Sequence, residues 1–179
     1  MLGDSSVYLR RLEATDLDRT WEWINTPEIY LAIGTNAPVS KTAQVRWFEA
    51  LDRASDKIVF AVCLRDDNRH IGNISLDSIE LRHRHARLSI FLADSTCRGK
   101  GFGTRAMTLL LNYAFGLLNL HRVFLKVSAE RADAVRFYQR IGFRTEGLLR
   151  EHEFLNGRYS DKQMLGILRS EWETRPRRD

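Results

Sequence analysis

The segment Arg98-Gly99-Lys100-Gly101-Phe102-Gly103 decides the fold of this chain, because it joins a strand-like run to a helical one. The strand-like run ends near Ala93, and apolar residues such as Ala106 and Leu110 recur at helical spacing after the segment. The helix therefore begins at the glycines, where the unpaired N–H groups of its first turn face any bound anion. We predict a pyrophosphate site here, since two linked phosphates need several donors from one short stretch.

The position of this segment excludes two common phosphate-binding loops. The dinucleotide-binding pattern follows the first strand of a βαβ unit, with an acidic residue about twenty positions later. Here the segment begins only at residue 98, after several predicted strands. The P-loop pattern ends in Gly-Lys followed by Ser or Thr, which this segment lacks. We therefore expect neither of these nucleotide-binding folds.

The hydrophobic periodicity around the segment predicts alternating strands and helices. Strand patterns occupy residues 7–12, 58–64, 71–76, 86–93 and 123–127. Helical patterns occupy residues 17–24, ended by Pro27, residues 40–56 with Ser40 as N-cap, residues 101–117, and residues 132–141, stopped by Gly142. A final hairpin turns at Asn156-Gly157. We expect strands 86–93 and 123–127 to be parallel, because a helix links them, in a mixed α/β sheet with helices on both faces.

The two N-terminal helices carry apolar stripes. In the helix that begins at Ser40, Val45, Phe48 and Leu51 recur at three-residue spacing and are expected to face the core. Trp21 fits the stripe of the preceding helix, whereas Trp23 falls off it and is a candidate to line a pocket.

The bulk composition fits one compact domain. The chain has 179 residues, of which 44% are hydrophobic, so we treat residues 1–179 as a single domain. Residues 173–179, rich in arginine, are expected to form a loose basic tail. No apolar run reaches the roughly eighteen residues of a membrane span, and the first ten residues lack a secretory pattern. With only Cys63 and Cys97 as cysteines, we predict a cytoplasmic protein without a membrane partner.

The net charge of +5 could indicate a polyanionic partner. Because this charge is diffuse, a nucleic-acid binder is kept only as an alternative, and we expect no nucleic-acid partner. His83 and His85 have a spacing that could suggest a metal, but no further ligand lies near them in the sequence. We therefore predict no metal, and the sequence leaves a homodimer open.

Two motifs together resemble the GNAT acetyltransferase superfamily. Residues 98–103 match its cofactor motif, Arg/Gln-x-x-Gly-x-Gly/Ala, and Ala134, Tyr138 and Gly142-Phe143 match its second motif about thirty residues later. Residues 111–115 and 147–150 are similar to the branch that holds spermidine and ribosomal-protein N-terminal acetyltransferases. The resemblance implies a mostly antiparallel twisted sheet of about seven strands. It also implies transfer of an acetyl group from acetyl-CoA to a primary amine, of a small molecule or a protein N-terminus, by direct attack in a ternary complex.

The resemblance assigns roles to particular residues. Tyr138 corresponds to the general acid that protonates the departing CoA thiolate. The pantetheine arm of acetyl-CoA would pair with the backbone of Phe91 and Leu92. The residues expected to bind the rest of the cofactor are Arg98, Gly99, Lys100, Gly101, Phe102, Gly103, Thr104, Arg131, Ala134 and Tyr138.

The catalytic base is left open by two departures from the family pattern. Arg87 stands where relatives often have a glutamate, and Arg131 stands where many have an asparagine. Asp77, Glu80 or Ser128, the last with a chain of water molecules, could take the proton of the amine. Because the usual glutamate is missing, a non-catalytic acyl-CoA-binding or sensing domain is the alternative function.

Overall fold

The computed structural model describes residues 1–33, 38–155 and 157–175. Its strands are β1 (Leu2–Gly3), β2 (Val7–Arg11), β3 (Ile58–Leu64), β4 (His70–Glu80), β5 (His85–Leu92), β6 (Arg122–Ser128), β7 (Arg144–Leu155) and β8 (Arg158–Leu168). Its α-helices are α1 (Leu17–Ile24), α2 (Pro27–Ile33), α3 (Lys41–Leu51), α4 (Phe102–Asn112), α5 (Ala132–Ile141) and α6 (Arg169–Thr174).

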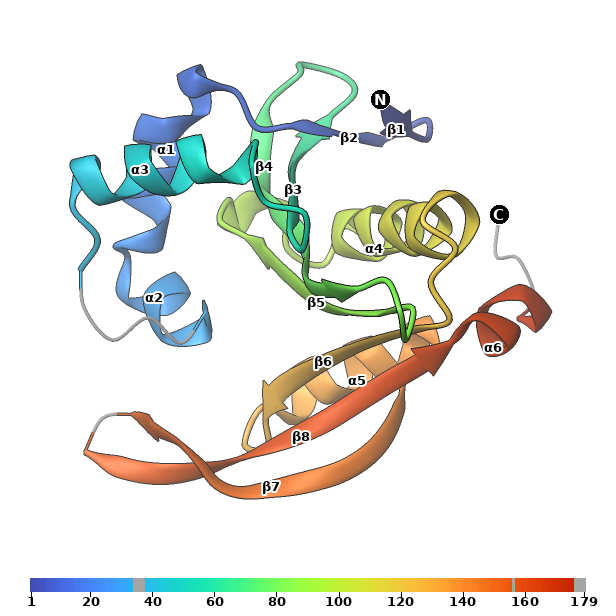
Figure 1. Ribbon diagram of the computed structural model, residues 1–179. Helices are drawn as coiled ribbons and strands as arrows, with labels where there is room; N and C mark the ends of the chain where they lie inside the picture. The colour runs from blue at the N-terminus through green and yellow to red at the C-terminus, as the bar shows by residue number, and fades with distance from the viewer. Residues whose placement is uncertain (34–37, 156, 176–179) are drawn as a thin grey trace. The chain divides into compact units, whose positions relative to one another are not determined.

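The described strands form one sheet in the order β1-β2-β3-β4-β5-β6-β8-β7 (Figure 1). β5 and β6 are parallel, as predicted for strands that a helix connects. The pairs β1–β2, β2–β3, β3–β4, β6–β8 and β7–β8 are antiparallel. The expectation of a mixed, mostly antiparallel sheet is confirmed, and the two-residue β1 is an eighth strand beyond the predicted seven.

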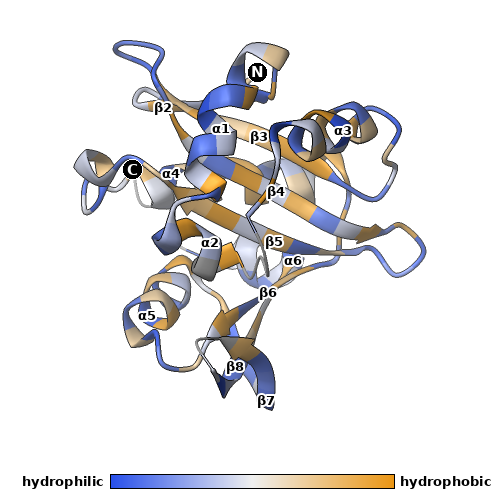
Figure 2. Ribbon diagram, turned by 90° about the vertical axis from the view of Figure 1, so that its left-hand side faces the viewer, coloured by the Kyte–Doolittle hydropathy of each residue, from blue (hydrophilic) through white to orange (hydrophobic). Residues whose placement is uncertain are grey.

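The chain divides into two compact units, residues 1–77 with 89–110 and residues 78–88 with 111–179. In the first unit, Tyr8 on β2 lies opposite Cys63 on β3. These two side chains share one face of the sheet and pack with Leu51 of α3 in a buried cluster. Helices α1 and α3 cover this face of β2 and β3, and the first-unit part of α4 covers the other face (Figures 1 and 2). Helices therefore lie on both faces of the sheet in this unit.

In the second unit, β6 is paired with β5 on one side and with β8 on the other. Gly142 ends α5 with a φ of 118°, and a Cβ built there would lie 3.3 Å from Ile167 Cδ1 on β8. Ile167 lies opposite Val123, and both are buried. The apolar face of β6 and β8 is therefore the face that carries α5.

The N-terminal helices differ from the predicted ones in three places. Pro27 does not end the first helix, because α1 already ends at Ile24 and Pro27 begins α2, a position where the missing N–H costs nothing. The second predicted helix ends at Leu51 rather than near Asp56. Within it Val45 is 41% exposed, so the three-residue spacing misplaced one residue of the stripe. Ser40 does cap the helix, accepting from Ala43 N at 3.1 Å.

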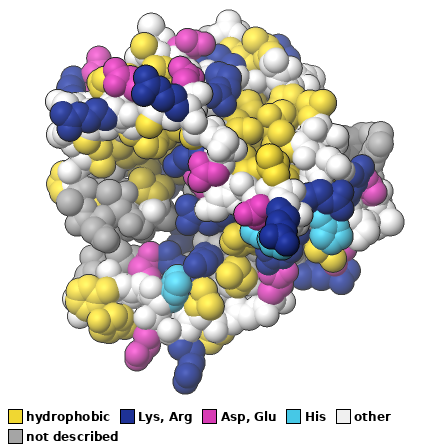
Figure 3. All heavy atoms as spheres, viewed as in Figure 1, with side chains coloured by type: hydrophobic (Ala, Val, Ile, Leu, Met, Phe, Trp, Pro, Cys, Tyr) yellow, Lys and Arg dark blue, Asp and Glu magenta, His cyan; other side chains and the backbone are white. Residues whose placement is uncertain are grey.

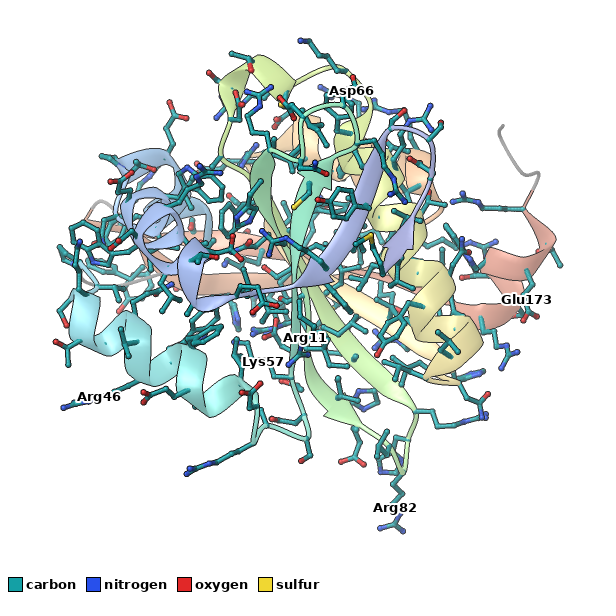
Figure 4. All side chains as sticks on the ribbon, turned by 90° about the horizontal axis from the view of Figure 1, so that it is seen from above. Arg11, Arg46, Lys57, Asp66, Arg82 and Glu173 are labelled. Carbon is teal, nitrogen blue, oxygen red and sulfur yellow. The ribbon has the colours of Figure 1, made fainter. Side chains whose placement is uncertain are left out.

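The later boundaries also shift. The long helix after the glycines continues from α4 into a π-helical turn, Tyr113–Leu117, whose last residue is 73% exposed. Asn156 of the predicted hairpin turn lies outside the described residues, and Gly157 has a φ of 78°. Residues 173 and 174, assigned above to a basic tail, belong to α6, where Glu173 is labelled in Figure 4. Residues 176–179 of that tail lie outside the described residues.

Candidate active site

The backbone between β5 and α4, in the first unit, has the features of an anion site. Gly99 and Gly101 adopt φ values of 74° and 82°, a region that residues with a Cβ rarely enter. The carbonyl of Gly101 accepts the first helical hydrogen bond, from Arg105 N at 3.1 Å. The N–H groups of residues 102–104 therefore have no helical acceptor and can bind an anion. A Cβ built at either Gly99 or Gly101 would meet nothing within 4 Å, so the backbone conformation is what requires glycine.

The cations of this loop are partly engaged by acids that sequence reasoning missed. Arg98 donates to Glu28 Oε2 at 2.8 Å, and Arg105, on the first turn of α4, donates to Asp4 Oδ2 at 3.2 Å. Among the described residues, Lys100 has no carboxylate partner. Glu28 lies seventy positions from Arg98, and no local pattern in the sequence points to such a pair.

The strand before the loop is held close to its neighbour. A Cβ at Gly72 on β4 would lie 2.2 Å from Phe91 O, so glycine permits the two backbones to approach here. Trp23 packs edge-on against Phe91 and His70, with ring centroids 6.3 and 4.8 Å apart. Trp23, which lies outside the apolar stripe of its helix, therefore contacts β5 and β4. Phe91 and Leu92 therefore lie at the end of β5, just before the glycine-rich loop, within the first unit.

Tyr138 lies on α5 in the second unit. Its ring packs edge-on against Phe137 and Phe143, with centroids 5.2 and 5.9 Å apart. Burial raises the pKa of its phenol above the usual value, and the positive charge of Arg131 opposes this rise. Among the described residues, none is hydrogen-bonded to Tyr138 Oη. The phenol therefore stays protonated at neutral pH and has its proton to give.

The other predicted residues of the second unit lie between β6 and α5. Ser128 ends β6, and its carbonyl accepts from Arg131 N at 3.0 Å. Arg131 is the N-cap residue of α5, and its side chain donates to Asp133 Oδ2 at 3.2 Å. Ala134 lies in the first turn of the helix and is partly buried. Ser128, Arg131, Ala134 and Tyr138 therefore belong to one strand-to-helix junction.

The candidate bases are engaged in other interactions. Asp77 Oδ1 is 3.1 Å from Lys57 Nζ, and Asp77 Oδ2 accepts from Ser75 Oγ at 3.1 Å. Glu80 Oε1 accepts from Arg82 N at 2.9 Å in the turn after β4, from which Arg82 points outward (Figure 4). Because both carboxylates are already engaged, neither is an obvious acceptor for the proton of the amine.

A buried polar network in the first unit was not predicted. Arg10 donates to both carboxylate oxygens of Asp16, at 2.6 and 2.8 Å. His70 Nδ1 is 3.2 Å from Asp16 Oδ1, and His70 Nε2 is 2.9 Å from Gly72 O. The network ties the start of α1 to β2 and β4. Arg10, Asp16 and His70 form no local sequence pattern, so a single sequence does not predict that they meet.

The structure shows no grouping of metal ligands within the ranges it describes: no three His, Cys, Asp or Glu side chains are close enough to hold an ion. The rings of His83 and His85 are stacked with centroids 6.3 Å apart. In the same ranges no helix has the length and apolar character to cross a membrane.

The positive-φ glycines after a middle strand, and the tyrosine on α5 whose pKa burial raises, fit the class of protein that the motifs indicate, an acyltransferase that uses coenzyme A. Residues 6–144 match the family described as the acetyltransferase (GNAT) domain. The chain therefore belongs to the GNAT acetyltransferase family, and the predicted N-acetyltransferase function and acetyl-CoA requirement are confirmed at the level of this family.

Similar proteins fit the branch that the sequence motifs indicated. The spermidine N(1)-acetyltransferase of Vibrio cholerae is 40% identical over 105 residues, 59% of this chain and 60% of that protein. A ribosomal N-acetyltransferase-like protein of Bacillus subtilis is 36% identical over 109 residues, 60% of this chain and 58% of that protein. These alignments span less than two thirds of either relative.

A solved structure is similar over nearly the whole chain. The crystal structure of spermidine N-acetyltransferase from Vibrio cholerae, in complex with CoA and spermine, has a TM-score of 0.90 and 30% sequence identity. The match covers 96% of this chain and 100% of the other. The GNAT fold expected from the motifs is therefore confirmed.

Proposed function

We propose that this protein transfers the acetyl group of acetyl-CoA to a primary amine, by direct attack of the amine within a ternary complex. The observation that carries the proposal is the loop between β5 and α4. Its two positive-φ glycines and the free N–H groups of residues 102–104 suit the pyrophosphate of CoA. We further propose that residues 1–179 act as one acetyltransferase domain.

The cofactor would be held by backbone more than by side chains. We assign its pyrophosphate to residues 98–104 and its pantetheine arm to the backbone of Phe91 and Leu92. We assign Arg131, Ala134 and Tyr138 to the same acetyl-CoA molecule. The pair between Arg98 and Glu28 is exposed at both ends, so it is weak enough for a phosphate to displace Glu28.

The nitrogen of the acceptor must lose two protons, and the sulfur of CoA must gain one. The ammonium loses the first proton before attack. The lone pair of the neutral amine then attacks the thioester carbonyl carbon and forms a tetrahedral intermediate. The nitrogen of this intermediate loses the second proton through water, which restores the proton that Tyr138 gives up. As the intermediate collapses, the C–S bond breaks and the thiolate takes the proton of Tyr138 Oη. The raised pKa of Tyr138 suits this donor role.

The proton of the acceptor ammonium has no assigned carboxylate base. Ser128 with water remains our candidate, because Asp77 is paired with Lys57 and Glu80 caps a turn. The small neutral fraction of the amine in solution also reacts once it is positioned beside the thioester.

The similar proteins indicate which amine acceptors to test first. Spermidine and spermine are the amines that their names and complexes carry, so polyamines are the first acceptors to test. The experiment measures acetyl-CoA binding by calorimetry and CoA thiol release with a panel of amines, with mass spectrometry of the product. Thiol release that depends on the amine and an N-acetylated product support the proposal. Acetyl-CoA binding without transfer to any amine would instead identify a sensing domain.

A further inference from the structure

Trp23 is an aromatic residue of α1 that the proposed mechanism does not use. It lies in the last turn of the helix and is only partly buried. Its ring packs edge-on against Phe91 of β5 and His70 of β4, and all three residues belong to the first unit. Hydrophobic side chains reach the surface along the N-terminal helices of this unit (Figure 3). A large ring from α1 therefore covers the end of β5 while part of its surface stays accessible.

The end of β5 has one free edge. Among the described residues, β5 pairs with β6 only over residues 85–87, although the strand continues to Leu92. The opposite edge is occupied by β4, since Ala93 N just beyond the strand donates to Ile71 O at 2.9 Å. A strand edge without a partner offers unpaired N–H and C=O groups. An extended ligand can therefore lie along β5 from Leu92 back toward Ser89.

The length of the pantetheine arm of CoA fits this edge. About twelve bonds separate the last phosphate oxygen of the arm from its sulfur, which is the length of about four residues of extended backbone. The pyrophosphate is assigned above to residues 98–104, directly after β5. An arm that runs back along the free edge then brings the sulfur beside residues 89–92. Phe91 is in the middle of this stretch, so its neighbours border the thioester.

The acyl group has room only on the side of α1. The first-unit part of α4 packs on the opposite face of the sheet, where Ala106, Met107 and Leu110 have no exposed surface (Figures 1 and 2). An amine must also reach the thioester carbonyl from the side that α4 does not fill. The side chain of Phe91 contacts Trp23 of α1. Trp23 is therefore the side chain of α1 that borders the acyl group.

The ring of Trp23 rests on a support that does not yield. His70 is 3% exposed, and its Nε2 lies 2.8 Å from Asn73 Oδ1 and 2.9 Å from Gly72 O. Its Nδ1 lies 3.2 Å from Asp16 Oδ1. Groups packed and hydrogen-bonded in this way resist the insertion of even one methylene. Space for a longer acyl chain can therefore come only from a smaller side chain at residue 23.

We propose that Trp23 limits the acyl group of the donor to two carbons. This inference rests on the proposed function and adds to it the residue that selects acetyl-CoA over longer acyl-CoA thioesters. The methyl of the acetyl group meets the indole ring, and each added methylene would have to displace that ring. A hydrophobic pocket discriminates one methylene by roughly tenfold or more. Trp23 determines specificity and takes no part in proton transfer.

The first experiment measures donor affinity without turnover. Titration calorimetry compares CoA, acetyl-CoA, propionyl-CoA and butyryl-CoA on the native protein, Trp23→Phe and Trp23→Ala. The affinity of the native protein is expected to fall roughly tenfold from acetyl-CoA to propionyl-CoA, and further for butyryl-CoA. Trp23→Ala should bind butyryl-CoA as tightly as acetyl-CoA, Trp23→Phe should be intermediate, and the affinity for CoA should not change. Equal affinities in the native protein, or the native order in Trp23→Ala, overturn the proposal.

Trp47→Ala is the matched control. Trp47 lies on α3 over the same face of the sheet and packs on the cluster that contains Leu51, so its loss is expected to keep the acetyl preference. Thermal unfolding shows whether each variant is folded. Trp23→Leu, which is expected to admit propionyl-CoA, replaces Trp23→Ala if that variant unfolds. A relaxed preference in Trp47→Ala overturns the assignment to Trp23, because general loosening of the helices would then explain it.

The failure of this inference is distinguishable from the failure of the proposed function. If neither CoA nor any acyl-CoA binds, both fail together. If the acyl-CoA thioesters bind without discrimination, the function stands and the role of Trp23 fails. With an amine that is acetylated, thiol release gives a second measurement. Trp23→Ala should then raise the kcat/KM of butyryl-CoA at least tenfold and leave the KM of the amine unchanged. A raised KM of the amine with the native donor preference overturns the proposal and assigns Trp23 to the acceptor.

Discussion

Arg98 of the glycine-rich loop donates to Glu28 of α2 at 2.8 Å, so the loop holds an internal anion where a phosphate is expected to bind. Both side chains are more than half exposed. Exposed ion pairs of this kind contribute about 0.2–1 kcal/mol. Glu28 therefore competes weakly with the cofactor for Arg98.

Replacing Glu28 is expected to strengthen cofactor binding. Glu28→Gln removes the competing charge and should tighten acetyl-CoA about 1.5- to 5-fold, the equivalent of an exposed ion pair. Isothermal titration calorimetry at low salt measures the effect. Glu49→Gln, an exposed acid on α3, is the matched control and should leave the affinity unchanged. Weaker binding in Glu28→Gln would mean that Glu28 positions Arg98 for the ligand.

The glycine at residue 101 is expected to be essential for the loop. Its φ of 82° disfavours any Cβ by about 1–2 kcal/mol, so Gly101→Val should abolish acetyl-CoA binding and Gly101→Ala should weaken it about 5- to 30-fold. Gly116→Ala is the control, because Gly116 has open space and no positive φ. Calorimetry and thermal unfolding compare the three variants. Wild-type affinity in Gly101→Val would place the pyrophosphate elsewhere.

Loss of the Tyr138 hydroxyl is expected to slow turnover and to spare binding. Tyr138→Phe keeps the ring that packs on Phe137 and Phe143, and it should lower kcat about a hundredfold or more, the usual contribution of a general acid. The dissociation constant of acetyl-CoA, measured by calorimetry, should not change. Stopped-flow measurement of thiol release gives the rate, and full activity would refute the role.

The same residue leads to a prediction about pH. A general acid acts only while protonated, so activity that depends on it is lost as the pH rises through its pKa. Because burial raises the pKa of Tyr138 above 10, no loss of kcat attributable to this phenol is expected between pH 7 and pH 9. A pH profile of kcat in that range tests the assignment. A falling limb that disappears in Tyr138→Phe would show that the phenol ionises earlier.

The buried network around Asp16 is expected to make the fold acid-sensitive. Burial by itself would raise the pKa of Asp16, but the hydrogen bonds from Arg10 and Glu13 N and the His70 charge lower it overall. Its contribution to stability is therefore present above the unfolded pKa near 4 and lost as the pH falls through the folded value. Burial also lowers the pKa of His70, so stability falls as the pH drops below about 6.5, where the unfolded histidine takes up a proton.

Asp16→Asn tests the network directly. It leaves the charge of the partly buried Arg10 without its partner and should cost about 1–3 kcal/mol of unfolding free energy. Asp18→Asn, in the exposed pair between α1 and Lys41, is the matched control and should have a much smaller effect. Denaturant unfolding at pH 7 and pH 5 measures both. Equal costs for the two variants would contradict the structural role of Asp16.

Local patterns predicted most of the elements, because strand alternation, helix caps and glycine stops are properties of neighbouring residues. Ser40 caps α3 and Gly142 ends α5, as expected from the sequence. Pro27 was misread, because the same residue type can follow one helix or begin the next. Val45 was misplaced because a three-residue spacing drifts off one helical face within two turns.

The sequence by itself determined the acetyltransferase family, and it predicted the cofactor loop and the tyrosine donor, since each rests on residues that are adjacent or a few turns apart. Only the tertiary structure decided which acids neutralise the loop, which carboxylates are already engaged, and that Trp23 meets Phe91 and His70. Such pairs join residues far apart in the chain, and their positions depend on strand register. A one-residue change in register would turn every side chain of a strand to the other face, and no local pattern in a single sequence fixes that choice.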